Sequence, residues 1–448
     1  MKNKHTSHFR LAIIVGLSIF WGSCQDKDLV LPPQMVDVKS EVANAYFDLA
    51  IKITKETPGF TPPVAARAYG YTGVTLYESV VGGMSDYESL QGKINGLSVG
   101  ALPNSENGKE YHWGLAANSA LAEIMGGLYK TATPDNLTAL SNLKQQYEQQ
   151  FSAETSSDVA DRSIAFGEAI GRAMYEYSKT DGQDAAYTTN FPASYIPPVF
   201  PGAWVPTPPS FQKALQPYWG QVRPFLSADT AAQPIPHPAY STASTSVFYA
   251  QALEVYAVTS NLTPEQSDIA LFWSDDPGKT GTPPGHSLSI AKQALEKEEA
   301  SLAVAAETYA KVGMAVHDAF VSCWKCKYAY NLMRPVTYIQ QNIDPAYTTL
   351  LTTPPFPEFT SGHSAQAGAS MQILSDIFGY NFAFTDNTHV ARTDIDGSPR
   401  YFTSFMDAAN EAAISRLYGG IHYRAAIDYG IAHGRDIGEN IGAIQFKK

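Results

Sequence analysis

The chain has 448 residues, 44% of them hydrophobic and 17% charged, so it can bury one elaborate domain or two fused ones and leaves little room for disorder. Its formal net charge of −12 argues against nucleic acid as a main partner, because binding to a phosphate backbone needs a basic face. A cationic pocket of limited size stays compatible with this balance.

The first residues have the pattern of an export signal. A basic start, MKNK, precedes the apolar stretch LAIIVGLSIFWGS and Cys24, which matches a signal peptide better than a membrane span. Small residues directly before Cys24 make residues 1–23 resemble a bacterial lipoprotein signal, followed by a tether over 24–40; ordinary secretion is the alternative. We expect an exported lipoprotein, periplasmic or at the cell surface, that meets a membrane only through a lipid on Cys24.

Residues 41–190 are predicted to form an N-terminal helical half. Apolar residues recur three and four positions apart, and no run alternates with a period of two. The stretches with this pattern are 42–55, 64–82, 108–130, 135–150 and 155–178. The fold is therefore predicted to be all-α.

A proline-rich stretch follows at 191–238, and it contains 12 of the 29 prolines of the chain. Such a run is excluded from helices and central strands, and its interleaved aromatic residues favour an ordered strap on the surface over a loose linker. We interpret it as the boundary between two helical halves.

Residues 239–448 are predicted to form the C-terminal helical half. Pro283 and Pro284 fit the first turn of a helix, where a missing N–H costs little. The expected helices lie near 241–258, 263–273, 284–298, 299–330, 361–379, 401–418 and 422–442, with a loop around TDIDGSPR.

Two cysteines, Cys323 and Cys326, form the sequence CWKC. A redox pair would need a βαβ context, and a zinc site would need further ligands. We interpret them as a structural pair, either two thiols or a local disulfide.

The first group of candidate site residues lies in KYAYNLMRP. Lys327 and Arg334 are seven residues apart, so on one helix that Pro335 ends they would project within about 20° of each other. Both could then reach one ligand, although a lysine and an arginine on one face are more often only solvated.

The second group is EFTSGHSAQ. A helix that begins at Ser361 would offer an anion the Ser361 hydroxyl and the Gly362 N–H, with His363 as an acid or base in its first turn. The alternative is that Ser361 only caps the helix.

The third group is SRLYGGIHYRAAIDYG. Arg416 and His422 would point about 240° apart on an unbroken helix, so they converge only if Gly419 and Gly420 break it. Otherwise they are a surface arginine and a core histidine. Together the three groups hold one lysine and two arginines, which suits a multiply charged tetrahedral oxyanion.

Three motifs thus occur in order: K-x6-R-P from Lys327, S-G-H from Ser361, and S-R-x3-G-x-H from Ser415. In order and spacing they resemble the signature shared by vanadium-dependent haloperoxidases and type 2 phosphatidic acid phosphatases. The stretches 57–79 and 272–286 are also similar to segments of bacterial vanadium haloperoxidases, particularly the iodoperoxidase-like branch. The resemblance implies an all-helical fold with two four-helix bundles.

The resemblance also implies roles for individual residues. His422 would bind vanadium, His363 would be the acid–base residue that assists peroxide binding, and Asp276 would be a partner of Arg416. Trp324 and Phe356 fall where the family lines the halide side of the pocket. The residues implied to hydrogen-bond the vanadate oxygens are Lys327, Arg334, Ser361, Gly362 and Arg416.

The implied activity is oxidation of a halide, iodide or bromide rather than chloride, by hydrogen peroxide to hypohalous acid, with an organic acceptor where one is used. Vanadate would act as a Lewis acid, and the arginines and the lysine would withdraw electron density.

Two positions depart from the family pattern. Thr360 stands where proline is common, and Ala426 stands where many phosphatases have an aspartate that orients the histidine; the nearest acid is Asp428. Because a nucleophilic histidine needs such a partner, Ala426 favours vanadate.

Two other functions are the alternatives to a haloperoxidase. One is an acid phosphatase of the type 2 family, without a cofactor, that forms a phosphohistidine at His422. The other is a tethered binding lipoprotein without turnover.

Overall fold

The structure is a computed structural model that describes residues 38–231 and 236–448. These residues contain fourteen α-helices and one two-stranded sheet, so the all-α prediction is confirmed. The expected signal peptide, Cys24 and most of the expected tether lie outside the described residues. Within the described ranges, none of the helices has the length and apolar character that a membrane span requires.

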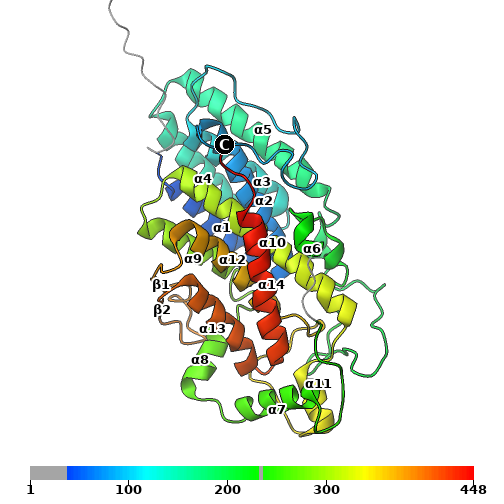
Figure 1. Ribbon diagram of the computed structural model, residues 1–448. Helices are drawn as coiled ribbons and strands as arrows, with labels where there is room; N and C mark the ends of the chain where they lie inside the picture. Colours follow the sequence, from blue (N-terminus) through cyan, green and yellow to red (C-terminus); the bar gives the residue numbers. More distant parts are fainter. Residues whose placement is uncertain (1–37, 232–235) are drawn as a thin grey trace, which may run out of the picture. The chain divides into compact units, whose positions relative to one another are not determined.

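The first five helices follow the predicted stretches closely. Thr133 and Ser156 cap the fourth and fifth helices through their side chains, which is why both begin where they do. The helix α3 packs against α2, α4 and α5 (Figure 1). The bounds are α1 (Glu41–Glu56), α2 (Pro62–Val80), α3 (Trp113–Leu128), α4 (Pro134–Ser152) and α5 (Ser157–Lys179).

The longest helix, α10 (Leu302–Tyr330), packs along α2 and also contacts helices of the C-terminal part (Figure 1). Glycines allow this close approach: a Cβ on Gly73 would lie 2.3 Å from the carbonyl oxygen of Tyr309. The N-terminal and C-terminal helices therefore share a packed interface across the proline-rich stretch. The domain boundary at that stretch stays a prediction.

The C-terminal helices agree with the predicted stretches except for the short helix Pro335–Asn342, which was not predicted, and α12 packs tightly on α14. An antiparallel pair of short strands, β1 (Phe384–Asp386) and β2 (Arg400–Phe402), flanks the predicted loop and was not predicted. The remaining helices of this part are α7 (Val247–Thr259), α8 (Pro264–Phe272), α9 (Thr282–Lys297), α11 (Pro335–Asn342), α12 (Gly362–Phe378), α13 (Phe405–Tyr418) and α14 (Arg424–Gly442).

The described part of the proline-rich strap is ordered by its contacts. Trp204 and Trp219 are fully buried, and the N–H of Trp204 donates to the carbonyl of Asn331 over 2.7 Å. The N–H of Leu215 donates to the carbonyl of Pro355 over 2.8 Å. A short helix, α6 (Ser227–Ala231), lies near the C-terminal end of the stretch 191–238. The prediction that this stretch contains no helix was therefore wrong there. The strap thereby braces the end of α10 and the loop that precedes α12.

The prediction that Lys327 and Arg334 share one helix is wrong. The helix α10 ends at Tyr330, and Asn331 adopts a left-handed conformation with φ of 47°. Arg334 is the residue that precedes α11. Asparagine tolerates this conformation after a helix better than most residues, and it turns the chain back toward the cavity described below.

The predicted break between Arg416 and His422 is confirmed. Gly420 has a φ of 78°, and a Cβ there would lie 2.8 Å from the hydroxyl oxygen of Tyr347. Because α14 begins at Arg424, His422 lies in the turn before the helix and not in its first turn. The turn can therefore aim the His422 ring back across the end of α13.

Candidate functional site

A cavity of about 320 Å³ lies where the loop before α12 meets the α8–α9 connection and the turn between α13 and α14. Residues of the second and third groups line it together: Gly362, His363, Arg416 and His422. Lys327 and Arg334 lie behind this lining and are fully buried. Three distant parts of the sequence thus converge on one small space.

His422 is held at both ring nitrogens. Its Nδ1 lies 2.8 Å from Oε1 of Glu358, and its Nε2 lies 3.2 Å from Nη1 of Arg334. The backbone N–H of Tyr423 also donates to Oε1, so this oxygen is an acceptor and Nδ1 carries the hydrogen. Burial and three nearby cations hold the pKa of His422 well below its usual range. The ring is therefore neutral, and the lone pair of Nε2 accepts from Arg334, so a bond from Nε2 to another group would replace this contact.

The two arginines each keep a buried donor without a partner. Arg334 donates to the carbonyls of Phe356 (2.9 Å) and Ile421 (2.8 Å), and Arg416 donates to the carbonyl of Trp273 (3.0 Å). Arg334 Nη2 and Arg416 Nε are buried and unpaired. Burial lowers the pKa of both guanidinium groups to about 10, so both stay charged at neutral pH. An anion would satisfy both donors.

Lys327 is placed differently from what the sequence suggested. Its ammonium donates to the carbonyls of Pro357 (3.1 Å), Glu358 (3.0 Å) and Thr360. Burial lowers the pKa of Lys327 to about 8. Lys327 therefore fixes the loop before α12, and a direct bond to an anion would require exchange of one of these three bonds.

The start of α12 confirms the capping interpretation of Ser361. Its Oγ accepts from the N–H and the hydroxyl of Ser364, over 3.2 and 2.9 Å. The ring of His363 interacts with the backbone carbonyls of Trp273 and Ser274, and its buried Nε2 is unpaired. Burial and the charge of Arg416 hold the pKa of His363 well below its usual range, so the imidazole is neutral and can accept a proton at Nε2.

An aromatic wall closes one side of the cavity. Trp324 and Phe356 line it with ring centroids 4.8 Å apart, and Phe320 packs beside Trp324. The guanidinium carbon of Arg334 lies 4.9 Å from the centroid of Phe356, and Lys327 Nζ lies 5.0 Å from it. The wall is therefore apolar toward the cavity and backed by cations.

Asp276, the predicted partner of Arg416, lines the same cavity. The charge of Asp276 partly offsets the lowering of the Arg416 pKa by burial. The two side chains form no ion pair within 4 Å. The direct partner of Arg416 is the carbonyl of Trp273. Asp276 thus contributes charge at a distance.

A solved structure of a bacterial vanadium-dependent iodoperoxidase superimposes on this chain with a TM-score of 0.80. The two are 37% identical, over 91% of this chain and 96% of that one. The chain belongs to the vanadium-dependent haloperoxidase family. Residues 307–446 also match the family model described as the VCPO second helical-bundle domain.

More distant haloperoxidases share parts of the chain or its fold. Vanadium chloroperoxidase from Curvularia inaequalis is 26% identical over 249 residues, which are 42% of this chain and 39% of that protein, so the match spans about two fifths of that relative. A holo-type bacterial vanadium-dependent chloroperoxidase has a TM-score of 0.66 at 14% identity, over 87% of this chain and 93% of that one. The latter shows a common fold.

The cofactor of the haloperoxidase family fits the residues present. Vanadate is an oxyanion, and the cavity is lined by Arg416 with its unpaired Nε, by the N-terminus of α12 at Gly362 and by His422, while the unpaired Nη2 of Arg334 lies behind this lining. A Cβ on Gly362 would point at the Trp324 ring, 3.4 Å away, so glycine keeps the space beside the helix start open. The residues of the cavity are therefore compatible with vanadate, the group that the family implies.

Glu358 is a site residue that the sequence did not reveal. Its carboxylate accepts from Nδ1 of His422, and the side chain is fully buried. The inference that Ala426 disfavours a nucleophilic histidine therefore loses its basis, because Glu358 supplies the missing partner. The signal available was a single charged residue in the apolar run PPFPEF.

Both cysteines of CWKC lie on α10 behind the aromatic wall as buried thiols, so the disulfide alternative is wrong. Burial raises the pKa of Cys326 to about 12 and also raises that of Cys323, so neither is a reactive thiolate at neutral pH. They are structural residues.

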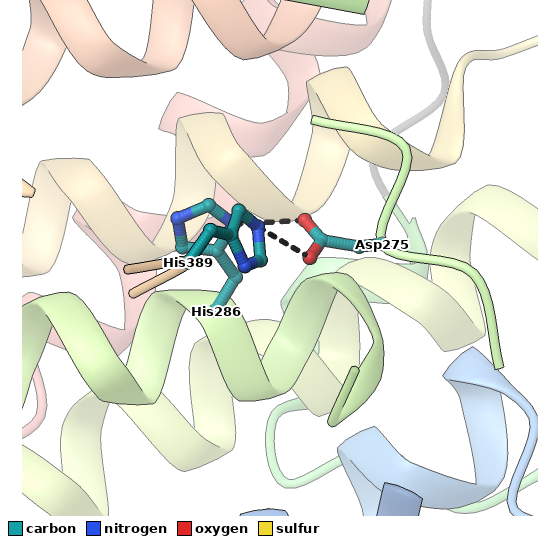
Figure 2. Close-up of side chains that lie close together, drawn as sticks. All are labelled: Asp275, His286 and His389. Carbon is teal, nitrogen blue, oxygen red and sulfur yellow. Dashed lines mark hydrogen bonds and ion pairs between the residues drawn. The ribbon is translucent and has the colours of Figure 1, made fainter. Parts of the chain in front are cut away.

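A second buried polar cluster, also unpredicted, lies beside the cavity (Figure 2). Asp275 pairs with Nδ1 of His286 over 2.8 Å, and Nε2 of His286 pairs with Asp386 over 2.7 Å. Nε2 of His389 lies 3.3 Å from Asp275, without the alignment of a hydrogen bond. Two carboxylates therefore enclose the His286 ring.

This cluster predicts a pH dependence of stability. The carboxylates of Asp275 and Asp386 outweigh burial and raise the pKa of His286 from 6.5 to about 10. Between these values the folded state holds one more proton than the unfolded state, so its stability falls with rising pH, by about 1.4 kcal/mol per pH unit. Urea unfolding of the wild type and H286Q at several pH values checks this. The difference between the two proteins should shrink from about pH 6 to about pH 10, and a constant difference would contradict the assignment.

Proposed function

We propose that this haloperoxidase uses vanadate and hydrogen peroxide to oxidise iodide or bromide to the hypohalous acid. The observation that supports it most is the pair of unpaired buried donors on Arg334 and Arg416 beside the lone pair of His422. Iodide is the first choice because the 37% identical relative is an iodoperoxidase. The net reaction moves one oxygen atom from peroxide to halide, consumes one proton and releases water.

The position of each residue in the cavity indicates its role in this reaction. Nε2 of His422, the guanidinium groups of Arg334 and Arg416 and the N–H of Gly362 would hold vanadate, which supplies a Lewis acid that activates peroxide. His363 can take a proton from hydrogen peroxide at Nε2, because its ring is neutral and that buried nitrogen has no hydrogen-bond partner. Trp324 and Phe356 exclude water from one side and give a large, polarisable halide an apolar surface.

The test is peroxide-dependent oxidation of chloride, bromide and iodide by purified protein loaded with orthovanadate, beside metal analysis. We expect turnover with iodide or bromide, and none in protein stripped of vanadate. Stoichiometric vanadate without oxidation of any halide would contradict the proposal.

A phosphatase is the second candidate, and the Glu358 to His422 contact favours it, because a carboxylate partner is what a nucleophilic histidine needs. His422 would form the phosphohistidine, and His363 would protonate the leaving group. Hydrolysis of an aryl phosphate that orthovanadate inhibits, together with a trapped phosphohistidine, would support it.

Oxyanion binding should stabilise the protein measurably. The cavity concentrates three cations, so an anion relieves their repulsion and satisfies two buried donors. Orthovanadate at about 100 times its dissociation constant should add about 2.7 kcal/mol to the free energy of unfolding. Thermal unfolding with vanadate, phosphate and sulfate checks this. No shift with any of them would contradict an oxyanion site.

We further propose export as a lipoprotein, which rests on the first 24 residues alone. Metabolic labelling with a fatty acid should mark the wild-type protein and not C24A. Label that persists in C24A, or a mature protein that is released without lipid, would contradict the anchor.

A further inference from the structure

We propose that Asp275, His286 and Asp386 form a positioning network that holds the 273–276 segment, and through it His363 and Arg416, in the arrangement that the reaction needs. The inference rests on the proposed haloperoxidase function for its catalytic meaning. The structural part of the proposal is that these three buried residues, which lie outside the oxyanion site, determine where His363 and Arg416 point.

The 273–276 segment touches the site at several consecutive residues. The carbonyl of Trp273 accepts from Arg416 Nη1 over 3.0 Å. The carbonyls of Trp273 and Ser274 act on the ring of His363, and the charge of Asp276 acts on Arg416. A shift of this segment would therefore release a guanidinium donor of Arg416 and change the surroundings of the His363 ring, which lines the same cavity as Ser274.

The segment needs a side-chain support at Asp275, because backbone hydrogen bonds hold Trp273, Ser274 and Asp276 but, among the described residues, none joins the backbone of Asp275. The segment lies between α8 and α9, and Asp275 adopts a left-handed φ of 47°, which aspartate tolerates better than most residues but less readily than glycine. Its side chain is 1% exposed and points into the protein. The support is therefore the contact that the Asp275 carboxylate makes.

His286 connects that carboxylate to two further elements. The histidine comes from the first turns of α9, and its second nitrogen is bonded to Asp386 of β1. The imidazole also stacks on Trp273, with centroids 4.4 Å apart and an interplanar angle of 15°. The segment is thus tied to α9 and β1 through both a carboxylate and an indole ring.

A divalent cation is the competing occupant, because Asp275, His286 and His389 offer ligand atoms within 4.8 Å of one another. Oδ1 of Asp275 and Nε2 of His389 are unpaired, as metal ligands would be. Both nitrogens of His286, however, already face carboxylate oxygens at hydrogen-bond distance. The contacts therefore favour a protonated histidine between two carboxylates over a bound metal ion. Measurement of the metal content of the purified protein tests the alternative.

The first test compares the wild type with H286Q, D386N and the charge-conserving D386E. For H286Q we expect about 10- to 100-fold weaker orthovanadate binding by calorimetry, the range seen when an outer partner of a site is lost. We expect a lower kcat with a displaced pH profile, because His363 loses its orientation. D386N should show a smaller loss of the same kind, which D386E partly restores.

The control is H317Q. His317 is another fully buried histidine, bonded to the carbonyl of Arg223, and it does not line the cavity. H317Q should lose stability without a change in vanadate affinity or pH profile. If H286Q changes only stability, as H317Q does, the positioning role is wrong.

Two further measurements distinguish a failure of this proposal from a failure of the proposed function. Imidazole 15N resonances of oxyanion-free protein should show His286 protonated at both nitrogens, and H286Q should move the signals of His363. A neutral His286, or one equivalent of tightly bound divalent metal in the purified protein, would overturn the network. Absence of halide oxidation in the wild type would remove the proposed function and leave these resonances as the test.

Discussion

Replacement of His422 by alanine is expected to reduce peroxide-dependent halide oxidation by at least about 1000-fold, because loss of only an outer-shell partner of a metal ligand costs about 10- to 100-fold. The ring is neutral, and the lone pair of its Nε2 faces the guanidinium group of Arg334. The oxidation rate of iodide at saturating orthovanadate measures this loss.

The cavity should survive the H422A substitution well enough for a second measurement. Arg334 keeps its bonds to the carbonyls of Phe356 and Ile421, and Arg416 keeps its bond to Trp273. Weak binding of orthovanadate or phosphate should therefore persist while turnover disappears.

H433A is the matched control for that variant. His433 is also buried on the C-terminal helices, but its Nε2 faces Ser322 and not the cavity. This control should retain both binding and turnover. Substantial halide oxidation by H422A would mean that His422 does not bind the cofactor.

The three motifs predicted the candidate site because each lies at an element boundary that the sequence marks. Ser361 caps α12 and the diglycine breaks the chain after α13, whereas Pro335 was expected only to end a helix and in the structure begins α11, which was not predicted. These element boundaries depend on residues that are close together in the sequence, so they can be predicted without knowledge of how the helices pack. The convergence of Lys327 and Arg334 was predicted for the wrong reason: Asn331 turns the chain, and asparagine after a helix was a usable sign of that turn.

The supporting residues could not be found in the same way. Glu358 meets His422 across 64 positions, and His286 meets Asp386 across 100. Such pairs depend on how whole helices pack, and no spacing in the sequence records it. Burial offers the only hint, since a carboxylate or histidine within an apolar run needs a partner.

Glu358 carries the second large prediction. Burial raises the pKa of Glu358 to about 7, so above that pH E358Q removes a charge that makes the His422 lone pair more basic, while it keeps the size of the side chain and an oxygen acceptor. Two effects oppose each other: the loss of one negative charge strengthens the field of Arg334 and Lys327, which favours an oxyanion, while the ligand itself becomes weaker. We expect the ligand effect to dominate, because Glu358 touches the ring directly, and vanadate affinity should fall about 10- to 100-fold.

The control for E358Q comes from the position that the sequence suggested instead. Asp428 is exposed on α14 and was the nearest acid to His422 along the chain. D428N should leave orthovanadate affinity and turnover unchanged when both are measured with the E358Q protein. If E358Q binds vanadate more tightly than the wild type, the field of the cations outweighs the basicity of His422, and the cavity is then a site governed by charge, in which the histidine contributes little to holding the anion.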